Sequence, residues 1–353
     1  MSVENCTNLL YKRGPAVLGV CIAGLLCLIV TLLLIGPPEN ARAAAVEPPQ
    51  QAASLVSFDP LSAAAMHISE HAQADPKPRV PTRATISLYE RTTSPRLFRR
   101  QGCSAAQRGA TGVVILDFGK PSYNGHTYGT MLFSGVFAGN KKITGAMLDY
   151  ARGYAACLPR GSNDRIALAR GTSNYHPSVP SVYKAGRKWA RETMTLQRAL
   201  RAGSLDAHVT SAAADDVEPA WDRSFWRTRD FYRGYADSRV GHALYNYGSL
   251  DGGIVSGVWN AHQAFYVTGG MRYAHAIPEI YNRTMAREWA ALAQVAQHRY
   301  HRSVKFAGVM TERTSSNHGI KPRDAHRMLV RELTVQGRGD APARVPAAYT
   351  NIR

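Results

Sequence analysis

Residues 209–221 read Val209-Thr210-Ser211-Ala212-Ala213-Ala214-Asp215-Asp216-Val217-Glu218-Pro219-Ala220-Trp221. The small, apolar start predicts a strand over 209–217 that Pro219 ends, because proline offers no N–H to a neighbouring strand. Asp216 and Glu218 lie two apart, so on a strand they share a face, about 6.6 Å apart along the backbone. This stretch predicts a buried strand that delivers two carboxylates at its carboxyl end.

A carboxyl pair at that place has two interpretations. Parallel α/β folds put their chemistry at the carboxyl ends of strands, and sugar hydrolysis needs one protonated and one ionised carboxyl group. The alternative is an acidic helix start, with Asp222 capping a helix from Arg223 onward.

Strand-like and helix-like segments alternate over about 200 residues. Strands are expected at 112–117, 165–170, 209–217, 243–247, 264–267, 276–280 and 304–310. Helices are expected at 144–157, 182–201, 223–236 and 282–300. The pattern predicts an α/β fold with a mainly parallel sheet, a (β/α)8-like TIM barrel, possibly incomplete. An open doubly wound sheet is the competitor, but Asp117-Phe118-Gly119-Lys120-Pro121 stands where its G-x-G-x-x-G turn would be.

The first 45 residues are expected to lie outside the fold. Lys12 and Arg13 precede an uncharged apolar run over 15–35, and an Ala-x-Ala pattern follows. This predicts a signal peptide or, because the run is long, an uncleaved membrane anchor. Either route places the remaining chain outside the cytoplasm, secreted or at the cell surface.

Composition sets the other boundaries. Residues 46–83 are rich in Ala, Pro, Ser and Gln and predict a disordered linker. The barrel domain is expected over 84–335, with 84–110 a basic approach segment, and 336–353 is expected to be a flexible tail.

Two cysteines remain beyond the leader, Cys103 and Cys157. An even number in an oxidising compartment predicts a disulfide between them; two separate buried thiols are the alternative.

The chain carries a net charge of +18. A basic exported protein can meet anionic wall polymers, lipid headgroups or nucleic acid. Nucleic acid is excluded as an expected partner, because neither zinc-finger spacing nor an RNA-recognition motif is present.

Acidic residues gather at the expected strand ends. They are Asp117, Asp215, Asp216, Glu218, Glu279 and Glu312. In a barrel these ends converge on one face. We expect Glu218 to donate a proton, and Asp216 and Asp117 to stay ionised and stabilise positive charge on a sugar. Asp215 points the other way along the strand and is expected to be structural.

Aromatic residues accompany the acids, and flat rings stack on sugars. Substrate contacts are expected for Trp221, Tyr245, Tyr247 and Trp259, together with Glu279 and Glu312. The alternative is that these aromatic residues only pack the core.

The sequence lacks two motifs of other hydrolytic enzymes, the serine-nucleophile motif and the zinc-protease motif. G-x-S-x-G and H-E-x-x-H are absent from the sequence. We expect neither a cofactor nor a metal site.

The chain resembles the glycoside-hydrolase-like barrels of secreted bacterial proteins, which are similar to lysozyme- and chitinase-like glycoside hydrolases. Two stretches carry the resemblance: Leu116-Asp117-Phe118-Gly119 and Asp215-Asp216-Val217-Glu218-Pro219. The resemblance covers about residues 110–312 and implies a barrel that acts on a wall or extracellular glycan. The first strand departs from the Gly-x-Asp-x-Ser typical of such lysozymes.

Two classes of function follow. One is an exported glycosidase acting on a polysaccharide or peptidoglycan-like glycan. The other is a non-catalytic surface protein on a degenerate barrel that binds glycan or is structural, since a fold alone does not give a function. An uncleaved leader would add the membrane as a partner.

Overall fold

The computed structural model describes residues 84–219, 221–222, 224–251, 253–256, 258–312, 320–337 and 344–353. The expected leader and linker over 1–83 lie outside the described residues. Within the described part, no helix is both long and apolar enough to cross a membrane.

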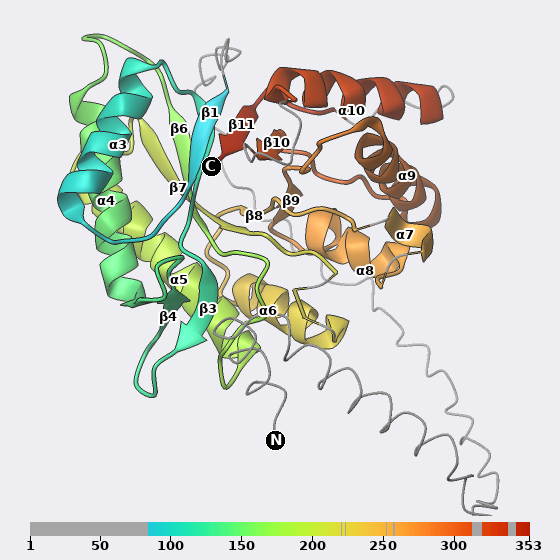
Figure 1. Ribbon diagram of the computed structural model, residues 1–353, viewed down its shortest axis with the longest axis horizontal. Helices are drawn as coiled ribbons and strands as arrows, with labels where there is room; N and C mark the ends of the chain where they lie inside the picture. Colours follow the sequence, from blue (N-terminus) through green and yellow to red (C-terminus); the bar gives the residue numbers. More distant parts are fainter. Residues whose placement is uncertain are drawn as a thin grey trace, which may run out of the picture. The chain divides into compact units, whose positions relative to one another are not determined.

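Eight parallel strands form one curled, barrel-like sheet (Figure 1). In chain order they are β1 (Thr85–Tyr89), β2 (Gly112–Asp117), β6 (Ile166–Gly171), β7 (Val209–Asp215), β8 (Leu244–Asn246), β9 (Ala274–Ala276), β10 (Val309–Glu312) and β11 (Tyr349–Ile352). Strands that are consecutive in the chain are neighbours in the sheet, except β9 and β10, which form its two edges; the last strand, β11, pairs with the first, β1. This order excludes the open doubly wound sheet, whose strand order reverses at a switch point.

The two edge strands of the sheet, β9 and β10, approach each other as well. Ala276 pairs with Phe306, and Glu279 pairs with Met310, both in parallel. The N–H of Ala276 donates to the carbonyl of Lys305 at 2.8 Å, and the N–H of Ile280 to that of Met310 at 3.1 Å. Edge groups that would otherwise be unpaired are thereby satisfied.

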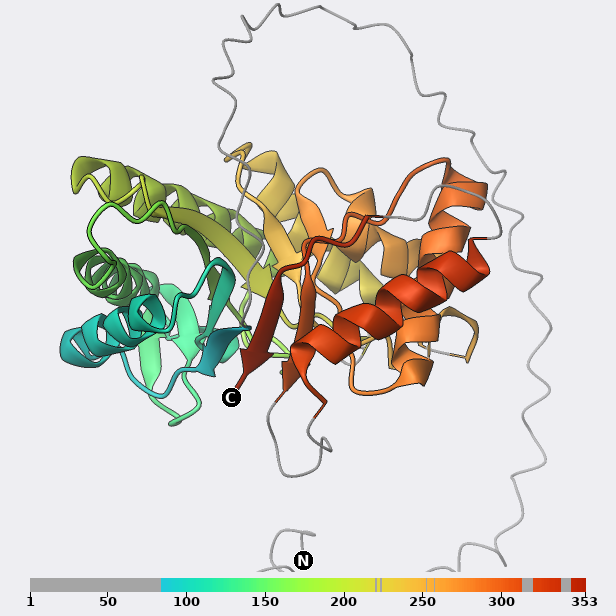
Figure 2. The same cartoon turned by 90° about the horizontal axis from the view of Figure 1, so that it is seen from above.

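Helices follow the strands and cover the outside of the sheet. They are α3 (Pro95–Gln107), α4 (Asn140–Ala156), α5 (Val182–Ala202), α6 (Phe225–Asp237), α7 (Gly253–Ser256), α8 (Ala261–Phe265) continued by the π-helical turn η2 (Tyr266–Gly270), α9 (Arg283–Tyr300) and α10 (Pro322–Gln336). Figure 2 shows β10 and β11 side by side, with α10 running beside them.

Apolar side chains fill both sides of the sheet. Inside, Ile115, Ala169, Ala214 and Met310 belong to one buried cluster. Outside, separate clusters lie under α3 and α4, under α5 and α6, and under α9 and α10. Strands buried on both faces explain the continuous apolar runs of the sequence.

A three-stranded antiparallel sheet is inserted between β2 and α4. It comprises β3 (Lys120–Tyr123), β4 (Tyr128–Met131) and β5 (Phe137–Gly139). The loop after β4 carries Phe133 to the carboxyl end of the barrel-like sheet, where its ring packs edge-on against Tyr89 at 5.0 Å.

The predicted disulfide is confirmed, since Cys103 and Cys157 are bonded. It joins α3 to the residue that follows α4. The two helices pack so closely that a Cβ on Gly102 or Gly153 would overlap the backbone of the other helix. Glycine is therefore required at this crossing.

Three expectations are corrected by the structure. Residues 84–110 hold β1 and α3, because Phe98, Ala105 and Ala106 form a buried face between the arginines. Residues 264–267 are helical, not a strand. The expected tail contains β11, which pairs with both β1 and β10.

Candidate functional site

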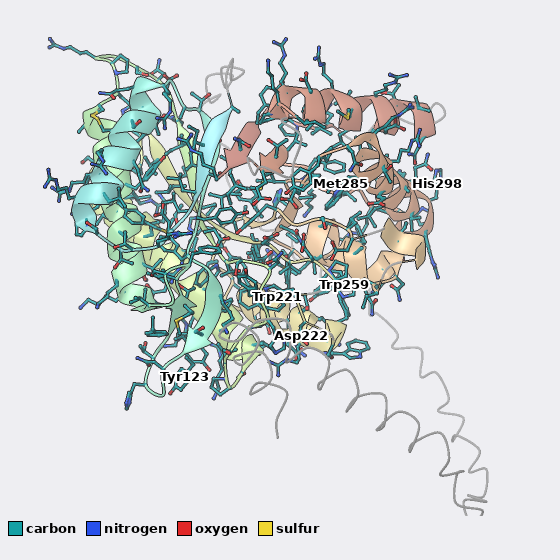
Figure 3. The ribbon with its side chains drawn as sticks, viewed as in Figure 1. Tyr123, Trp221, Asp222, Trp259, Met285 and His298 are labelled. Atoms are coloured by element: carbon teal, nitrogen blue, oxygen red, sulfur yellow. A yellow bond between two sulfur atoms is a disulfide. The ribbon has the colours of Figure 1, made fainter. Side chains whose placement is uncertain are left out.

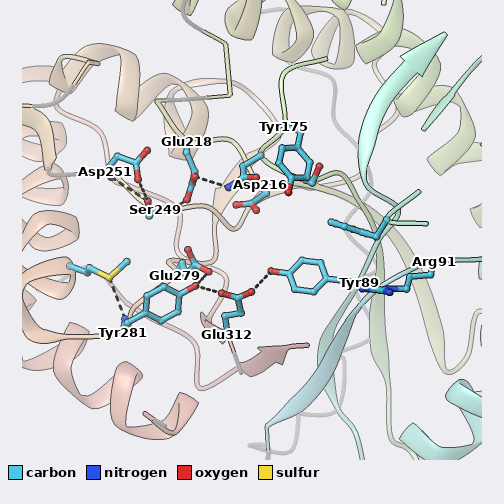
Figure 4. A pocket seen from close by; sticks show the side chains of 14 residues that line it. Tyr89, Arg91, Tyr175, Asp216, Glu218, Ser249, Asp251, Glu279, Tyr281 and Glu312 are labelled. Atoms are coloured by element: carbon cyan, nitrogen blue, oxygen red, sulfur yellow. Dashed lines mark hydrogen bonds between the residues drawn. The ribbon is translucent and has the colours of Figure 1, made fainter. Parts of the chain in front are cut away.

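A pocket of about 630 Å³ lies at the carboxyl ends of the parallel strands (Figure 4). Side chains from β1, from the loops after β1, β4, β6, β7, β8 and β9, from the end of β10 and from the start of α9 line it. They are Tyr89, Arg91, Phe133, Ser173, Asn174, Tyr175, Asp216, Glu218, Ser249, Asp251, Glu279, Tyr281, Met285 and Glu312. Of the residues expected from the sequence, the structure brings Asp216, Glu218, Glu279 and Glu312 together here.

Glu218 is held by donors from two neighbouring loops. The Nδ2 of Asn174 donates to its Oε2 at 3.0 Å, and the backbone N–H of Ser249 donates to its Oε1 at 3.1 Å. Both hydrogen bonds hold the carboxyl group in one orientation. Glu218 is 9% exposed and lines the pocket, so its carboxyl group has a fixed position there.

Asp216 has the opposite environment. It is 9% exposed, and its Oδ1 has no hydrogen-bond partner. Burial, followed by the charges of Glu279 and Glu218, raises the pKa of Asp216 well above its ordinary value. A carboxyl group in this position retains its proton.

Glu279 lies among the other acids. Burial, then the charges of Glu218, Glu312 and Asp251, raises the pKa of Glu279 well above its ordinary value. The hydroxyl of Tyr281 donates to its Oε1. Because both groups have a raised pKa and the charge of Glu279 acts on Asp216, a proton bound at this place is favoured over two negative charges.

Glu312 lies between two tyrosines (Figure 4). The hydroxyl of Tyr89 donates to its Oε1 at 3.0 Å, and that of Tyr281 to its Oε2 at 3.4 Å. Burial, then the charge of Glu312, raises the pKa of Tyr89, so this hydroxyl stays protonated and continues to donate.

Backbone contacts position the loops that carry the acids. The N–H of Asp216 donates to the carbonyl of Thr172 at 2.9 Å, which extends the β6–β7 pairing by one residue. Asn246 joins the β7 and β8 loops, because its Nδ2 donates to Val217 and its Oδ1 accepts from the N–H of Gly248, both at 2.9 Å.

Asp117 and Asp215 are fully buried and do not line the pocket. Asp117 accepts from the N–H of Gly119 at 2.7 Å, and burial raises its pKa to about 7. Its charge still acts on Asp216. Asp215 faces away, as expected: it accepts from the hydroxyl of Tyr232 at 2.6 Å, and burial raises its pKa to about 8.

The four aromatic residues singled out from the sequence lie elsewhere. Trp221 packs edge-on against Phe231 and Trp259 against Phe225, both inside an apolar cluster (Figure 3). Both Tyr245 and Tyr247 belong to the cluster inside the sheet.

The aromatic side chains that line the pocket are Tyr89, Phe133, Tyr175 and Tyr281. Tyr175 and Tyr281 follow strand ends, so the reasoning applied to the acids also indicates these positions. Phe133 lies in the loop after β4 of the inserted sheet, and no strand-end pattern in the sequence indicates it.

The described residues contain no group of three His, Cys, Asp or Glu side chains placed to hold a metal ion. What the pocket offers chemically is a fixed carboxyl group, two carboxyl groups with raised pKa values, hydroxyl donors and aromatic faces. No protein family and no curated protein matches this sequence.

Proposed function

We propose that this chain is an exported carbohydrate-active protein that hydrolyses glycosidic bonds of a cell-wall or extracellular polysaccharide. In this proposal the curled sheet with its outer helices is a (β/α)8-like barrel. The proposal also takes residues 1–45 as the signal or anchor that carries the domain out of the cytoplasm.

One observation carries the proposal. A carboxyl group fixed by two hydrogen bonds, Glu218, and a buried carboxyl group whose pKa is raised, Asp216, line the same pocket at the carboxyl ends of the strands. Glycoside hydrolysis requires such a pair, with the two groups in different protonation states.

The roles are the reverse of those expected from the sequence. Asp216, kept protonated by burial and by Glu279, gives its proton to the oxygen that leaves as the glycosidic bond breaks. Glu218 stabilises the positive charge that develops at the anomeric carbon; water supplies the new hydroxyl group there, and the proton that this water loses returns to Asp216. Asp117 contributes a buried charge behind Asp216 without touching substrate.

The same pocket supports sugar binding. The rings of Tyr89, Phe133, Tyr175 and Tyr281 supply flat faces, and hydroxyl and amide groups supply hydrogen bonds. Trp221 and Trp259 would support the fold rather than the sugar, because both are buried in the core.

The test is release of reducing ends from purified wall and extracellular polysaccharides by the full chain, kept in a detergent that contains no sugar. Wild type is compared with Glu218→Gln and with Asp206→Asn, a control at an exposed position outside the pocket. Release by wild type and the control, but not by Glu218→Gln, supports the proposal. Binding without release from any glycan would favour the non-catalytic surface protein instead.

A further inference from the structure

The pocket is acidic in a strongly basic protein. Among the described residues that line it are five carboxyl groups, Asp216, Glu218, Asp251, Glu279 and Glu312, and a single cationic side chain, Arg91. Arg91 is exposed. The chain as a whole carries a net charge of +18, so the negative charge is concentrated at this site.

The proposed hydrolysis uses only some of these five carboxyl groups. One carboxylate and one acid are sufficient for bond cleavage. Asp251 and Glu312 then lie beside Glu279, and a bound cation would lower the mutual repulsion of these groups.

Asp216 gives a second, independent indication of a ligand. Its side chain is more than nine-tenths buried and lines the pocket, yet its Oδ1 accepts no hydrogen bond. A buried acceptor without a donor is costly, so a donor from a bound molecule would be strongly favoured.

A cationic donor would both satisfy Asp216 and reduce the repulsion among the acids. No three acidic or histidine side chains among the described residues are placed as metal ligands. An ammonium group fits, because it carries one positive charge and three donors, matching several separated carboxylates. Anionic sugars such as uronates would be repelled.

We propose that the pocket binds glycans whose sugars carry free ammonium groups, that is, amino-sugar polymers without their N-acetyl groups. The inference rests on the proposed function and names its substrate class. The four aromatic residues of the lining favour a glycan over a lysine-containing peptide, because they offer flat faces to sugar rings.

Asp251 is the residue that tests this most cleanly. It lines the pocket but has no part in the proposed bond cleavage. Its backbone is left-handed, with φ 44°, a conformation that Asn adopts as readily as Asp. Its Oδ1 accepts from the hydroxyl of Ser249 at 2.6 Å, and an amide oxygen can accept this hydrogen bond equally well.

The experiment is calorimetric titration of the full chain with glucosamine oligomers and with N-acetylglucosamine oligomers of the same length, at a pH where the amine is protonated. We expect the glucosamine oligomer to bind more tightly than the acetylated oligomer. Added salt should weaken binding of the glucosamine oligomer but not binding of the acetylated one. Asp251→Asn should weaken that binding roughly tenfold, the usual effect of losing one charged hydrogen-bond partner. Asp206→Asn should leave it unchanged.

Equal or tighter binding of the acetylated oligomer, or no binding of either, would overturn the inference. The same preparations are assayed for reducing-end release from neutral glycans. Glu218-dependent release there, without a preference for ammonium groups, would leave the proposed function standing and reject only the substrate class. Absence of both binding and release would reject the two together.

Discussion

A Cβ atom on Gly248 would lie 2.7 Å from Cγ of Glu218. It would also lie 3.0 Å from Oδ1 of Asp216. The backbone after β8 thus passes directly against the two acids and fixes how far they can move. Gly248 is needed because a larger side chain has no room there. Its backbone conformation does not require glycine, since its φ is not in the left-handed region.

Gly248→Ala should therefore displace both acids while leaving the backbone conformation accessible. We expect activity to fall roughly a hundredfold, because misplacement of a catalytic group by about 1 Å has that effect. Stability should fall by no more than about 1–3 kcal/mol, the usual cost of overpacking. The control is Gly145→Ala in α4, where a Cβ has open space; it should stabilise by about 1 kcal/mol and keep full activity. Equal activity of the two variants would contradict the role given to Gly248.

Glu279→Gln should change how activity depends on pH. The charge of Glu279 is, after burial, the largest cause that raises the pKa of Asp216. Removal of this charge lowers the pKa of Asp216, so Asp216 loses its proton at lower pH. The alkaline limb of the pH–rate profile therefore moves to lower pH. An unmoved or raised limb would show that Asp216 is not the proton donor.

Stability should also depend on pH through the buried acids outside the pocket. The folded state raises the pKa of Asp215 from 3.8 to about 8 by burial, and that of Asp117 to about 7. The folded protein thus binds these protons more tightly than the unfolded chain, and the free energy of unfolding falls as pH rises from about 4 to about 8. The effect is on the order of a few kcal/mol for each group.

Urea denaturation across that pH range checks this expectation. Asp215→Asn keeps an acceptor for the hydroxyl of Tyr232 but removes the titration, so its midpoint should vary less with pH than that of wild type. A steeper pH dependence in this variant would be inconsistent with a protonated Asp215.

The Cys103–Cys157 disulfide closes a loop with a sequence separation of 54. Loop entropy predicts that its loss costs about 4 kcal/mol. Unfolding followed with and without reductant measures this difference, and a double Cys→Ala variant at these positions should be insensitive to reductant. Equal stability with and without the disulfide would contradict the expectation.

Much of the fold could be predicted from local sequence. The apolar run over 112–117 and the helices at 182–202 and 283–300 have strong periodicity and lie where the sequence predicts them. Strand β11 is short and half polar, and it is defined by its pairing with β1, which is distant in sequence. The apolar stretch 264–267 predicts a strand wrongly, because a run this short does not distinguish a helix from a strand. The capping box formed by Asn260 and Gln263 marks the helix instead.

The site was predictable in part for the same reason. Strand-end positions in the sequence indicate the acids Asp216, Glu218, Glu279 and Glu312, and the pocket brings these four together. Sequence does not show which large side chains turn inward, so it does not distinguish Trp221 and Trp259, which pack the core, from residues that contact a sugar. The fixed position of Glu218 depends on hydrogen bonds across loops, from Asn174 and Ser249, that no local pattern encodes.

The central claim is that Glu218 acts on the bond being broken, and turnover of the glycan that wild type cleaves best tests it most directly. The account predicts that Glu218→Gln lowers kcat by about a hundredfold to ten-thousandfold. Binding of that glycan should change little, because Gln keeps the shape of Glu and one acceptor oxygen. Undiminished kcat in Glu218→Gln, with folding and binding like wild type, would contradict the account.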